Sequence, residues 1–470
     1  MPDDRVRLTR RVGRTLRREA HDLITPGPPT VQLAVPIGPE VPDDARVQEV
    51  LDLCMRIGEV LLASGEGADE TTRVMMRLAS ASGLSAVDVD ITFTSITMCC
   101  HRGMTAPPVT SMRLVRHRAL DLSRLLAVGR IIDRVEAGRV DVRSAGAELS
   151  EVVRAPHPYP RWVATVGWAG LAASIAVLLG GDAVTGAVAF VVTAVIDRIG
   201  RVLTRRGLPA FFQQVLGGML ATLSTAALFA VGVFPPGTRP SLVIAASITV
   251  LLSGLSLVGT VQDAISGYYV TSAGRAVEIA LLSAGLLTGV VLGLRIALEF
   301  APPLEVAGAL PTGFARLSLS VLAAATAAAA FGLAGYAPGR SLVASSLAGA
   351  AGWGVYAALV LGAGLGPVPA TGVAAVVVGA AAGAFRRGGG VPPLVVVLAG
   401  ITPLLPGFTA YRGFYQLAVE GAVDGLVTVT LALAIGLALA AGVALGDLLT
   451  RPRPARPRSV ADPAAPPGSA

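Results

Sequence analysis

The sequence predicts an α-helical polytopic membrane protein with about ten transmembrane helices in two inverted five-helix repeats, preceded by a small α+β cytoplasmic N-terminal domain. Three observations lead to this fold class. Of 470 residues, 53% are hydrophobic and only 15% are charged, which is too apolar for a soluble protein of this length. The apolar residues gather between 163 and 449, in runs of roughly 20 residues that can cross a bilayer. The third observation is a repeat, because the segment that begins at Gly254 recurs at Gly400.

The two ends of the chain are expected to be disordered. Residues 1–44 form an arm that is first basic and then rich in proline, and the cytoplasmic tail at 450–470 has a similar composition. Such segments have too few apolar side chains to build a core. The arginines of the arm are followed by no apolar stretch, so the arm is not a secretory signal peptide.

Residues 45–155 are predicted to form the cytoplasmic α+β domain. From Ala45, apolar residues recur at helical spacing, and Gly65-Glu66-Gly67 interrupts them before a second helix that ends at Gly83. The pattern then alternates with period two, which predicts a half-buried strand. The remaining elements are predicted in this order: one strand at Val87–Met98, a strand at Met112–Val115, and helices at Leu120–Ala137 and Val142–Val153.

The membrane domain is predicted to consist of repeat one at 160–297 and repeat two at 312–449. Arginines gather on one side of the predicted spans, so the positive-inside rule places both termini in the cytoplasm and the chain in the plasma membrane. An odd number of spans per half gives the second half the opposite orientation. The predicted spans are 163–180, 183–200, 211–233, 241–260, 274–296, 314–335, 341–363, 369–385, 391–408 and 422–447.

The strongest candidates for a substrate site are the repeated segments. In the first copy, hydrogen-bonding groups and a glycine follow an apolar run, and in the second copy prolines and a glycine open the backbone. Freed backbone groups at membrane depth are tolerated only where protein or a water-filled cavity satisfies them. The alternative is a pair of loops at the membrane faces, with Tyr411 and Arg412 as interfacial anchors. The substrate-binding residues predicted from these segments are Asp263, Ser266, Gly267, Tyr268, Pro406, Gly407, Tyr411 and Arg412.

Three carboxylates are candidates for proton coupling, namely Asp263, Glu278 and Asp424. A charge at the centre of a membrane helix is unfavourable by about 2.5–3.5 kcal/mol, so a carboxylate that is present there often carries protons or cations. Interfacial placement near the span ends is the alternative for Glu278 and Asp424. Gln213 and Gln214 complete the predicted substrate-binding set, unless they cap helices at the cytoplasmic face.

The sequence argues against an enzyme, a metal site and a nucleic-acid partner. The hydroxyls at 92–97 and His101 lack the glycine pattern of a nucleophile elbow. The odd number of cysteines (Cys54, Cys99 and Cys100) indicates neither a disulfide framework nor a metal site. The net charge of +7 comes from arginines, many of them beside predicted spans, and not from a nucleic-acid-binding face. No cofactor is expected.

Three motifs in a fixed order carry a family resemblance. They are the run Ser64–Val74, Tyr159-Pro160 before the first span, and Pro406-Gly407 followed by Tyr411-Arg412-Gly413. On these motifs the chain resembles the threonine/serine exporter family, from about residue 46 to residue 449. The resemblance implies export of L-threonine and L-serine from the cytoplasm, driven by the proton motive force. Membrane lipid and protons are then the other partners.

Two other functions stay open. Related proteins whose halves are separate chains are associated with dicarboxylate export, so a succinate-like substrate is the first alternative. The second is a membrane-anchored hydrolase, against which the number of spans and the repeat both argue. The sequence also leaves open whether copies of the chain assemble into a homo-oligomer.

Overall fold

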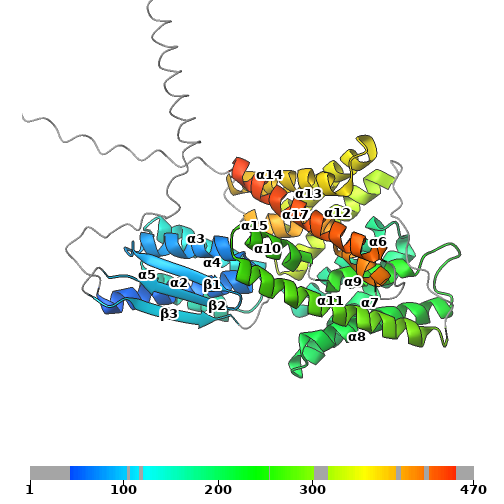
Figure 1. The fold of residues 1–470 in the computed structure, drawn as a ribbon, viewed down its shortest axis with the longest axis horizontal. Coiled ribbons are helices and arrows are strands. Elements are labelled where there is room, and N and C mark those ends of the chain that lie inside the picture. The colour runs from blue at the N-terminus through cyan, green and yellow to red at the C-terminus, as the bar shows by residue number, and fades with distance from the viewer. Residues whose placement is uncertain are drawn as a thin grey trace, which may run out of the picture.

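The computed structural model describes residues 43–102, 106–115, 120–252, 254–300, 316–387, 393–417 and 423–450. The predicted disordered arm, except for its last two residues, and most of the predicted tail lie outside these residues. Figure 1 shows a small α+β domain at one end of a larger helical bundle. The long helices of the bundle lead away from this domain or back toward it.

The N-terminal domain packs four helices and a three-stranded antiparallel sheet of order β1-β2-β3. The helices α2 and α3 cover one face of the sheet. The elements are α2 Asp44–Ala63, α3 Ala68–Ala81, β1 Val87–Thr92, β2 Ser95–Cys100, β3 Val109–Leu114, α4 Leu122–Glu136 and α5 Val142–Arg154.

The prediction of one strand over Val87–Met98 is wrong, because the chain turns back within it. Thr92 pairs with Ser95, so residues 93 and 94 form a two-residue hairpin turn. Phe93 takes a positive φ of 50° there. The alternation of apolar and polar residues shifts phase here, since apolar residues hold the odd positions up to Phe93 and the even positions from Ile96. Neither turn residue is one of the usual turn formers, so this shift is the sign of the reversal that the sequence carries.

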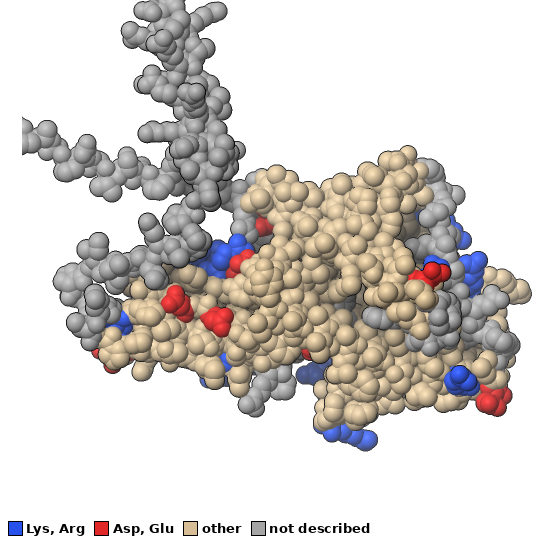
Figure 2. All heavy atoms as spheres, in the orientation of Figure 1, with Lys and Arg blue, Asp and Glu red and all other residues tan. Residues whose placement is uncertain are grey.

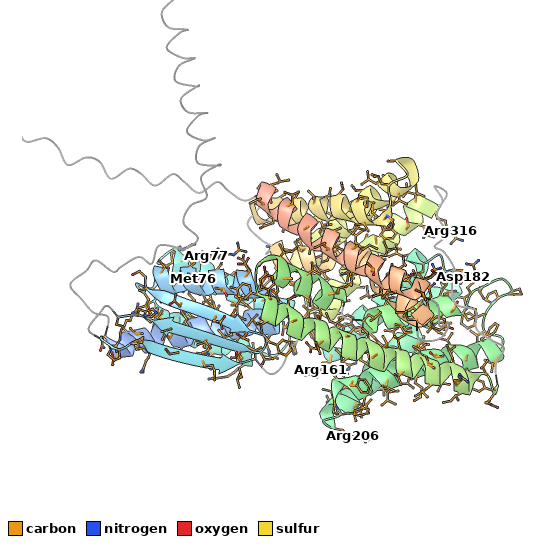
Figure 3. All side chains as sticks on the ribbon, in the orientation of Figure 1. Met76, Arg77, Arg161, Asp182, Arg206 and Arg316 are labelled. Atoms are coloured by element: carbon orange, nitrogen blue, oxygen red, sulfur yellow. The ribbon has the colours of Figure 1, made fainter. Side chains whose placement is uncertain are left out.

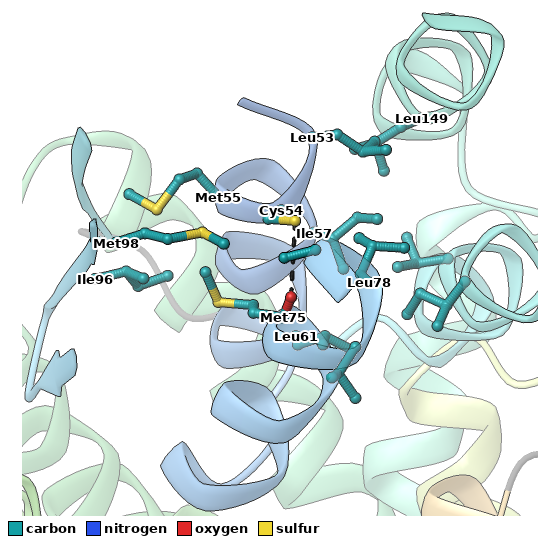
Figure 4. Close-up of a cluster of buried hydrophobic side chains, with 14 of the residues drawn as sticks. Leu53, Cys54, Met55, Ile57, Leu61, Met75, Leu78, Ile96, Met98 and Leu149 are labelled. Carbon is teal, nitrogen blue, oxygen red and sulfur yellow. Dashed lines mark hydrogen bonds between the residues drawn. The ribbon is translucent and has the colours of Figure 1, made fainter. Parts of the chain in front are cut away.

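The core of the N-terminal domain forms where α2 meets its neighbours. Figure 4 shows Met55, Met75 and Met98 against Ile96 on the sheet side, and Leu53 reaching Leu149 of α5. Cys54 is fully buried in this core, and burial raises the pKa of its thiol to about 12. Such a thiol stays protonated and unreactive.

The described part of the bundle contains eight helices that are long and apolar enough to cross a membrane, or up to ten spans if each of two bent pairs is one span. The pairs are bent by 47° and 44°. The elements before the gap at 301–315 are α6 Arg161–Leu178, α7 Ala183–Arg205, α8 Ala210–Ala230, α9 Ser241–Leu251, α10 Gly254–Ile265 and α11 Tyr269–Ala297. Those after it are α12 Leu317–Ala334, α13 Gly339–Gly362, α14 Pro367–Arg387, α15 Pro393–Gly400, η2 Thr402–Leu404, α16 Gly407–Tyr415 and α17 Asp424–Thr450.

Corresponding helices have corresponding neighbours in the two halves. The most extensive contacts are α8 with α11 and α14 with α17, and the first helices of the halves, α6 and α12, pack on each other. In the α8–α11 and α14–α17 pairs, two glycines four residues apart allow the helices to approach closely. The glycines lie on α11 and α17, against backbone carbonyls of α8 and α14, respectively. These glycines are Gly285 and Gly289 on α11, and Gly442 and Gly446 on α17.

Charged side chains are absent from the middle of one face of the bundle. In Figure 2 they lie on the N-terminal domain, at its junction with the bundle and toward the bundle's other limits, and the surface between is uncharged. Figure 3 places Asp182 and Arg316 at the end far from the N-terminal domain. There the Arg316 guanidinium donates to the Gly180 carbonyl at 2.9 Å, which joins the start of the second half to the α6–α7 connection.

Candidate functional site

The first bent pair, α9 and α10, is interrupted where Leu252 takes an extended conformation (ψ 126°). Gln214 of α8 lies at this interruption, and its Nε2 donates to the Leu251 carbonyl at 3.2 Å. The amide thus satisfies a carbonyl at the end of α9, as a break at membrane depth requires. Gln213 does something different. Its Nε2 donates to the Leu208 carbonyl at 2.7 Å, which closes the connection between α7 and α8.

The second bent pair is interrupted between α15 and α16, at the Pro-Gly dipeptide that the sequence singled out. Leu405 is extended (ψ 136°), because a following proline disfavours helical geometry. Pro406 then stands at the N-cap position and α16 begins at Gly407. Both residues are buried.

The two breaks approach each other inside the bundle. A Cβ at Gly407 would lie 2.9 Å from Cγ2 of Thr249, which is two residues before the end of α9. Tyr411 and Tyr415, one and two turns into α16, belong to the same buried cluster as Val243 of α9. The interior crossing of α9 and α16 therefore brings a helix C-terminus of one half to a helix N-terminus of the other. Such ends carry partial negative and partial positive charge, respectively.

Asp263 lies elsewhere, near the C-terminus of α10, and it is fully buried. Its Oδ2 forms an ion pair with Nη1 of Arg275 on α11 at 2.6 Å. Its Oδ1 accepts a hydrogen bond at 2.9 Å from the backbone N–H of Ala68, the first residue of α3 in the N-terminal domain. One carboxylate therefore joins two bundle helices and the N-terminal domain.

The turn between α10 and α11 is held on two sides by the N-terminal domain. On one side, the Tyr268 hydroxyl donates to Oγ1 of Thr72 on α3 at 2.9 Å. On the other, Oγ1 of Thr271 donates to the Ile91 carbonyl at 2.9 Å and accepts from the Phe93 N–H at 3.0 Å. The N–H in this contact belongs to Phe93, the turn residue with the positive φ. Within the same α10–α11 turn, Ser266 and Gly267 are exposed to solvent.

A second junction joins the N-terminal domain to the connection between α12 and α13. The N–H of Leu122, at the start of α4, donates to the Gly335 carbonyl at 2.8 Å. The His157 ring stacks on Tyr336 at a centroid distance of 4.3 Å, and its Nδ1 lies 3.0 Å from the carboxylate of Asp121. The N-terminal domain is thus attached to both halves of the bundle.

The structure separates the remaining predicted residues. Glu278 is partly buried in the interior of α11, whereas Asp424 is exposed at the first position of α17. Arg412 is partly buried on α16. The predicted set therefore divides into Gln214, Pro406, Gly407 and Tyr411 near the crossing of the breaks, and Asp263 and Tyr268 at the junction with the N-terminal domain.

Sequence reasoning missed Arg275 as the partner of Asp263, because the positive-inside rule accounted for the arginines beside the predicted spans as a group. A buried carboxylate near the end of a span needs a cationic partner. This requirement could have indicated a nearby arginine as the partner of Asp263. Thr249 carried no comparable signal. Within the described residues, no group of three His, Cys, Asp or Glu side chains is placed to hold a metal ion.

Comparisons with known proteins agree over both halves. A family model described as "Putative threonine/serine exporter" matches residues 52–297, and one described as "Threonine/Serine exporter, ThrE" matches residues 320–449. The chain is 40% identical to a "Probable threonine/serine exporter" of Mycobacterium tuberculosis, over 87% of this chain and 78% of the relative. It is 35% identical to a "Threonine/serine exporter" of Corynebacterium glutamicum, over 92% and 88%.

A more distant similarity covers about half of the chain. It is 25% identity to a "Probable succinate transporter subunit YjjP" of Escherichia coli, over 53% of this chain and 94% of that protein. No solved structure matches the chain.

Proposed function

The chain belongs to the threonine/serine exporter family, and from that premise we propose that it is a secondary transporter that exports L-threonine and L-serine from the cytoplasm across the plasma membrane. The observation that carries the proposal is the crossing of two interrupted helices, one from each half, with Gly407 against Thr249. Interrupted helices that meet between two structural repeats are typical of a secondary transporter's substrate site.

The proposed mechanism is alternating access by two inverted repeats. Its support is the correspondence of helix neighbours in the two halves, together with the direction of their last helices. In Figure 1, α11 leads away from the N-terminal domain whereas α17 returns toward it. An inverted pair of this kind rocks about a central site and opens it to each side in turn. The proposed topology keeps the N-terminal domain and both termini in the cytoplasm.

Substrate recognition is proposed at the crossing of the breaks. The carboxylate of the amino acid would face the N-terminus of α16 at Gly407, where the helix dipole and unbonded N–H groups favour an anion. Its ammonium would face carbonyls at the C-terminus of α9, beside Gln214. The side-chain hydroxyl of threonine or serine then needs one more partner, which Gln214 supplies.

Proton coupling is proposed at Asp263, with Glu278 and Asp424 as the other candidates. Asp263 is supported by its burial and by its place on the segment that follows the first break. A proton on Asp263 would weaken its ion pair with Arg275 and so release α10 from α11. Neutralising each of the three carboxylates in turn tests this, since proton-gradient dependence that survives in all three single variants removes them from coupling.

A counterflow assay tests the substrate class. Proteoliposomes that hold the purified protein are loaded with unlabelled threonine, serine or succinate, and uptake of the labelled compound is followed. We expect counterflow with threonine and with serine. Because the chain also matches proteins named as probable succinate transporter subunits, succinate is the rival substrate. Counterflow with succinate and with neither amino acid would reject the proposed substrate.

The same vesicles test two other functions. Flux that ignores an imposed proton gradient would indicate a passive channel. Deletion of the N-terminal domain tests the second function. A membrane-anchored hydrolase would show no transport with or without this domain. The relatives of this chain are named as transporters, which favours transport over hydrolysis.

A further inference from the structure

Three polar groups on α13 are buried and find no hydrogen-bond partner among the described residues. They are Oγ of Ser341, Oγ of Ser345 and Nε1 of Trp353. The two serines are 1% and 0% exposed. Together with Gly349 these residues occupy every fourth position of the helix, so each lies next to the one before it on the helix surface. The four residues form the polar line of α13.

Other buried hydroxyls of the bundle are bonded within their own helix. Thr222, Thr225 and Thr249 each donate to the carbonyl four residues earlier. Ser345 stands four residues after Ser341, yet its hydroxyl forms no such bond in the part of the chain that the structure describes. A buried polar group without a partner is unfavourable, and no lipid can supply one. Water or a ligand that reaches these serines therefore gains the hydrogen bonds that the protein leaves unmade.

The corresponding helix of the first half, α7, is bonded to its bent segment. Oγ1 of Thr193 on α7 donates to Oγ of Ser247 on α9 at 3.1 Å. Counted from the first residue of each helix, Thr193 has the position on α7 that Gly349 has on α13. Gly349 instead lies close to the backbone of α15, where a Cβ on it would be 3.7 Å from the Gly400 carbonyl oxygen. The bent segment is thus held by a hydroxyl pair in the first half, and by the contact of small residues in the second.

The polar line leads from the N-terminal domain to the second break. At its start, Leu342 packs on the core of the N-terminal domain. At its other end, a Cβ at Gly352 would lie 3.5 Å from Cδ1 of Leu404, in the short helix η2 directly before the break. The helix between Ser341 and Trp353 spans roughly 18 Å, at 1.5 Å per residue. A route along it would join the end of the bundle beside the N-terminal domain to the crossing of the breaks.

Small and apolar residues cover the line. Ala348 lies beside Ser345 in a buried cluster that includes Val378 of α14 and Val396 of α15. A Cβ at Gly400, the last residue of α15, would lie 3.1 Å from the Cβ of Ala348. Separation of α15 from α13 would uncover the serine hydroxyls without breaking a hydrogen bond that they make to the described residues.

We propose that the polar line of α13 lines the cytoplasmic entry route of the transporter, and that Ser341 and Ser345 bind the amino acid and its water on the way to the crossing. A small hydrated zwitterion fits this chemistry, because a hydroxyl can donate to a carboxylate and accept from an ammonium. The line carries no charge, so it does not hold the substrate as an ion pair would. The direction of the route rests on the proposed export function, whereas the burial of the serines does not.

Thiol labelling tests the route. Full-length protein with Ser345→Cys, in vesicles that expose either its cytoplasmic or its opposite face, is treated with a charged methanethiosulfonate reagent. Mass spectrometry of the peptide that holds residue 345 reads the modification, so the native cysteines can stay. The matched control is Leu347→Cys, because Leu347 is 57% exposed on the surface of the same helix and would face lipid.

We expect Ser345→Cys to be modified from the cytoplasmic face about tenfold faster than Leu347→Cys or more, because the reagent needs a hydrated thiolate. Equal rates at the two positions would overturn the proposal. Modification of Ser345→Cys from the opposite face alone would overturn it as well.

Substrate protection tests the contact with the amino acid. Threonine or serine should slow the modification of Ser345→Cys, since either would occupy the route. Modification that neither threonine, serine nor succinate slows would overturn the binding role of the serines. Protection by succinate alone would instead keep the route and reject the proposed amino-acid substrate. The two proposals can therefore fail separately.

Ser345→Ala separates a substrate contact from a structural role. Its hydroxyl has no partner to lose among the described residues, so the variant should keep the Tm of the wild type and raise the KM for threonine export by about two- to tenfold. Ser174→Ala is the matched control, because the Ser174 hydroxyl of α6 lies 3.0 Å from that of Thr326 on α12, and this variant should lower the Tm. A Tm that falls equally in both variants, or an unchanged KM in Ser345→Ala, would overturn the proposal.

Discussion

Asp263→Asn removes one charge of the buried pair that joins α10 to α11. The two side chains are 0% and 6% exposed, and the charged atoms are 2.6 Å apart. Removal of one partner of such a pair leaves the other charge buried without compensation, which costs about 3–5 kcal/mol. The new amide oxygen can still accept from the Ala68 N–H, so the loss reports the ion pair and not the interdomain hydrogen bond.

The pair between Asp197 and Arg201 on α7 is the matched control. Its atoms are 2.5 Å apart, yet the side chains are 20% and 26% exposed and both lie on one helix. Water compensates a charge in such a position, so Asp197→Asn should cost no more than about 1 kcal/mol. The residue types are the same and the distances differ by 0.1 Å, so the comparison tests burial together with the link between two helices.

Thermal or denaturant unfolding of the purified protein in one detergent provides the measurement. We expect Asp263→Asn to lower stability several times more than Asp197→Asn, and the double variant Asp263→Asn with Arg275→Gln to recover part of the loss. Recovery follows because the second change removes the uncompensated charge. The reasoning is refuted if the two single variants are equally stable, or if the double variant is less stable than Asp263→Asn alone.

Two further predictions concern the crossing of the breaks. Gln214→Leu leaves the Leu251 carbonyl without its donor and should lower stability by about 1–3 kcal/mol and slow counterflow. Gln213→Leu should leave counterflow unchanged, because Gln213 bonds to the Leu208 carbonyl in the α7–α8 connection. Equal effects of the two variants on counterflow would contradict the assignment. Gly407→Ala places a Cβ 2.9 Å from the Thr249 methyl and should slow counterflow. Thr249→Ala in the same chain removes the methyl and should restore counterflow. If it does not, the two helices do not meet in the working protein.

The sequence predicted the helical spans well because hydropathy is a local property. Each of the ten predicted apolar runs coincides with a long helix or with a bent pair. The second break was signalled by Pro406-Gly407, since proline and glycine act on their own backbone. The first break has no proline. Leu252, which is extended there, is an ordinary helix former.

The difference between local signals and tertiary contacts also separates the two groups of predicted site residues, those at the crossing of the breaks and those at the junction with the N-terminal domain. The shift by 146 positions paired the copies by composition and set Pro406 opposite Thr260, which lies inside α10 and not at a break. The similar segments therefore do different things in the two halves. The first copy ends at the N-terminal domain through Asp263 and Tyr268, and the second opens the backbone inside the bundle.

By itself the sequence determined the membrane class, the number of apolar runs and the family, because composition, periodicity and short motifs need no knowledge of distant contacts. Only the tertiary structure decided what the polar residues meet. Asp263 and Ala68 are 195 positions apart, and the helix start that binds the carboxylate is completed by a residue of another domain. The repeat suggested one shared site, whereas folding placed one copy at the interior crossing and the other at the junction. The physical reason is that a buried charge or an open helix end takes its partner from whatever the fold packs against it.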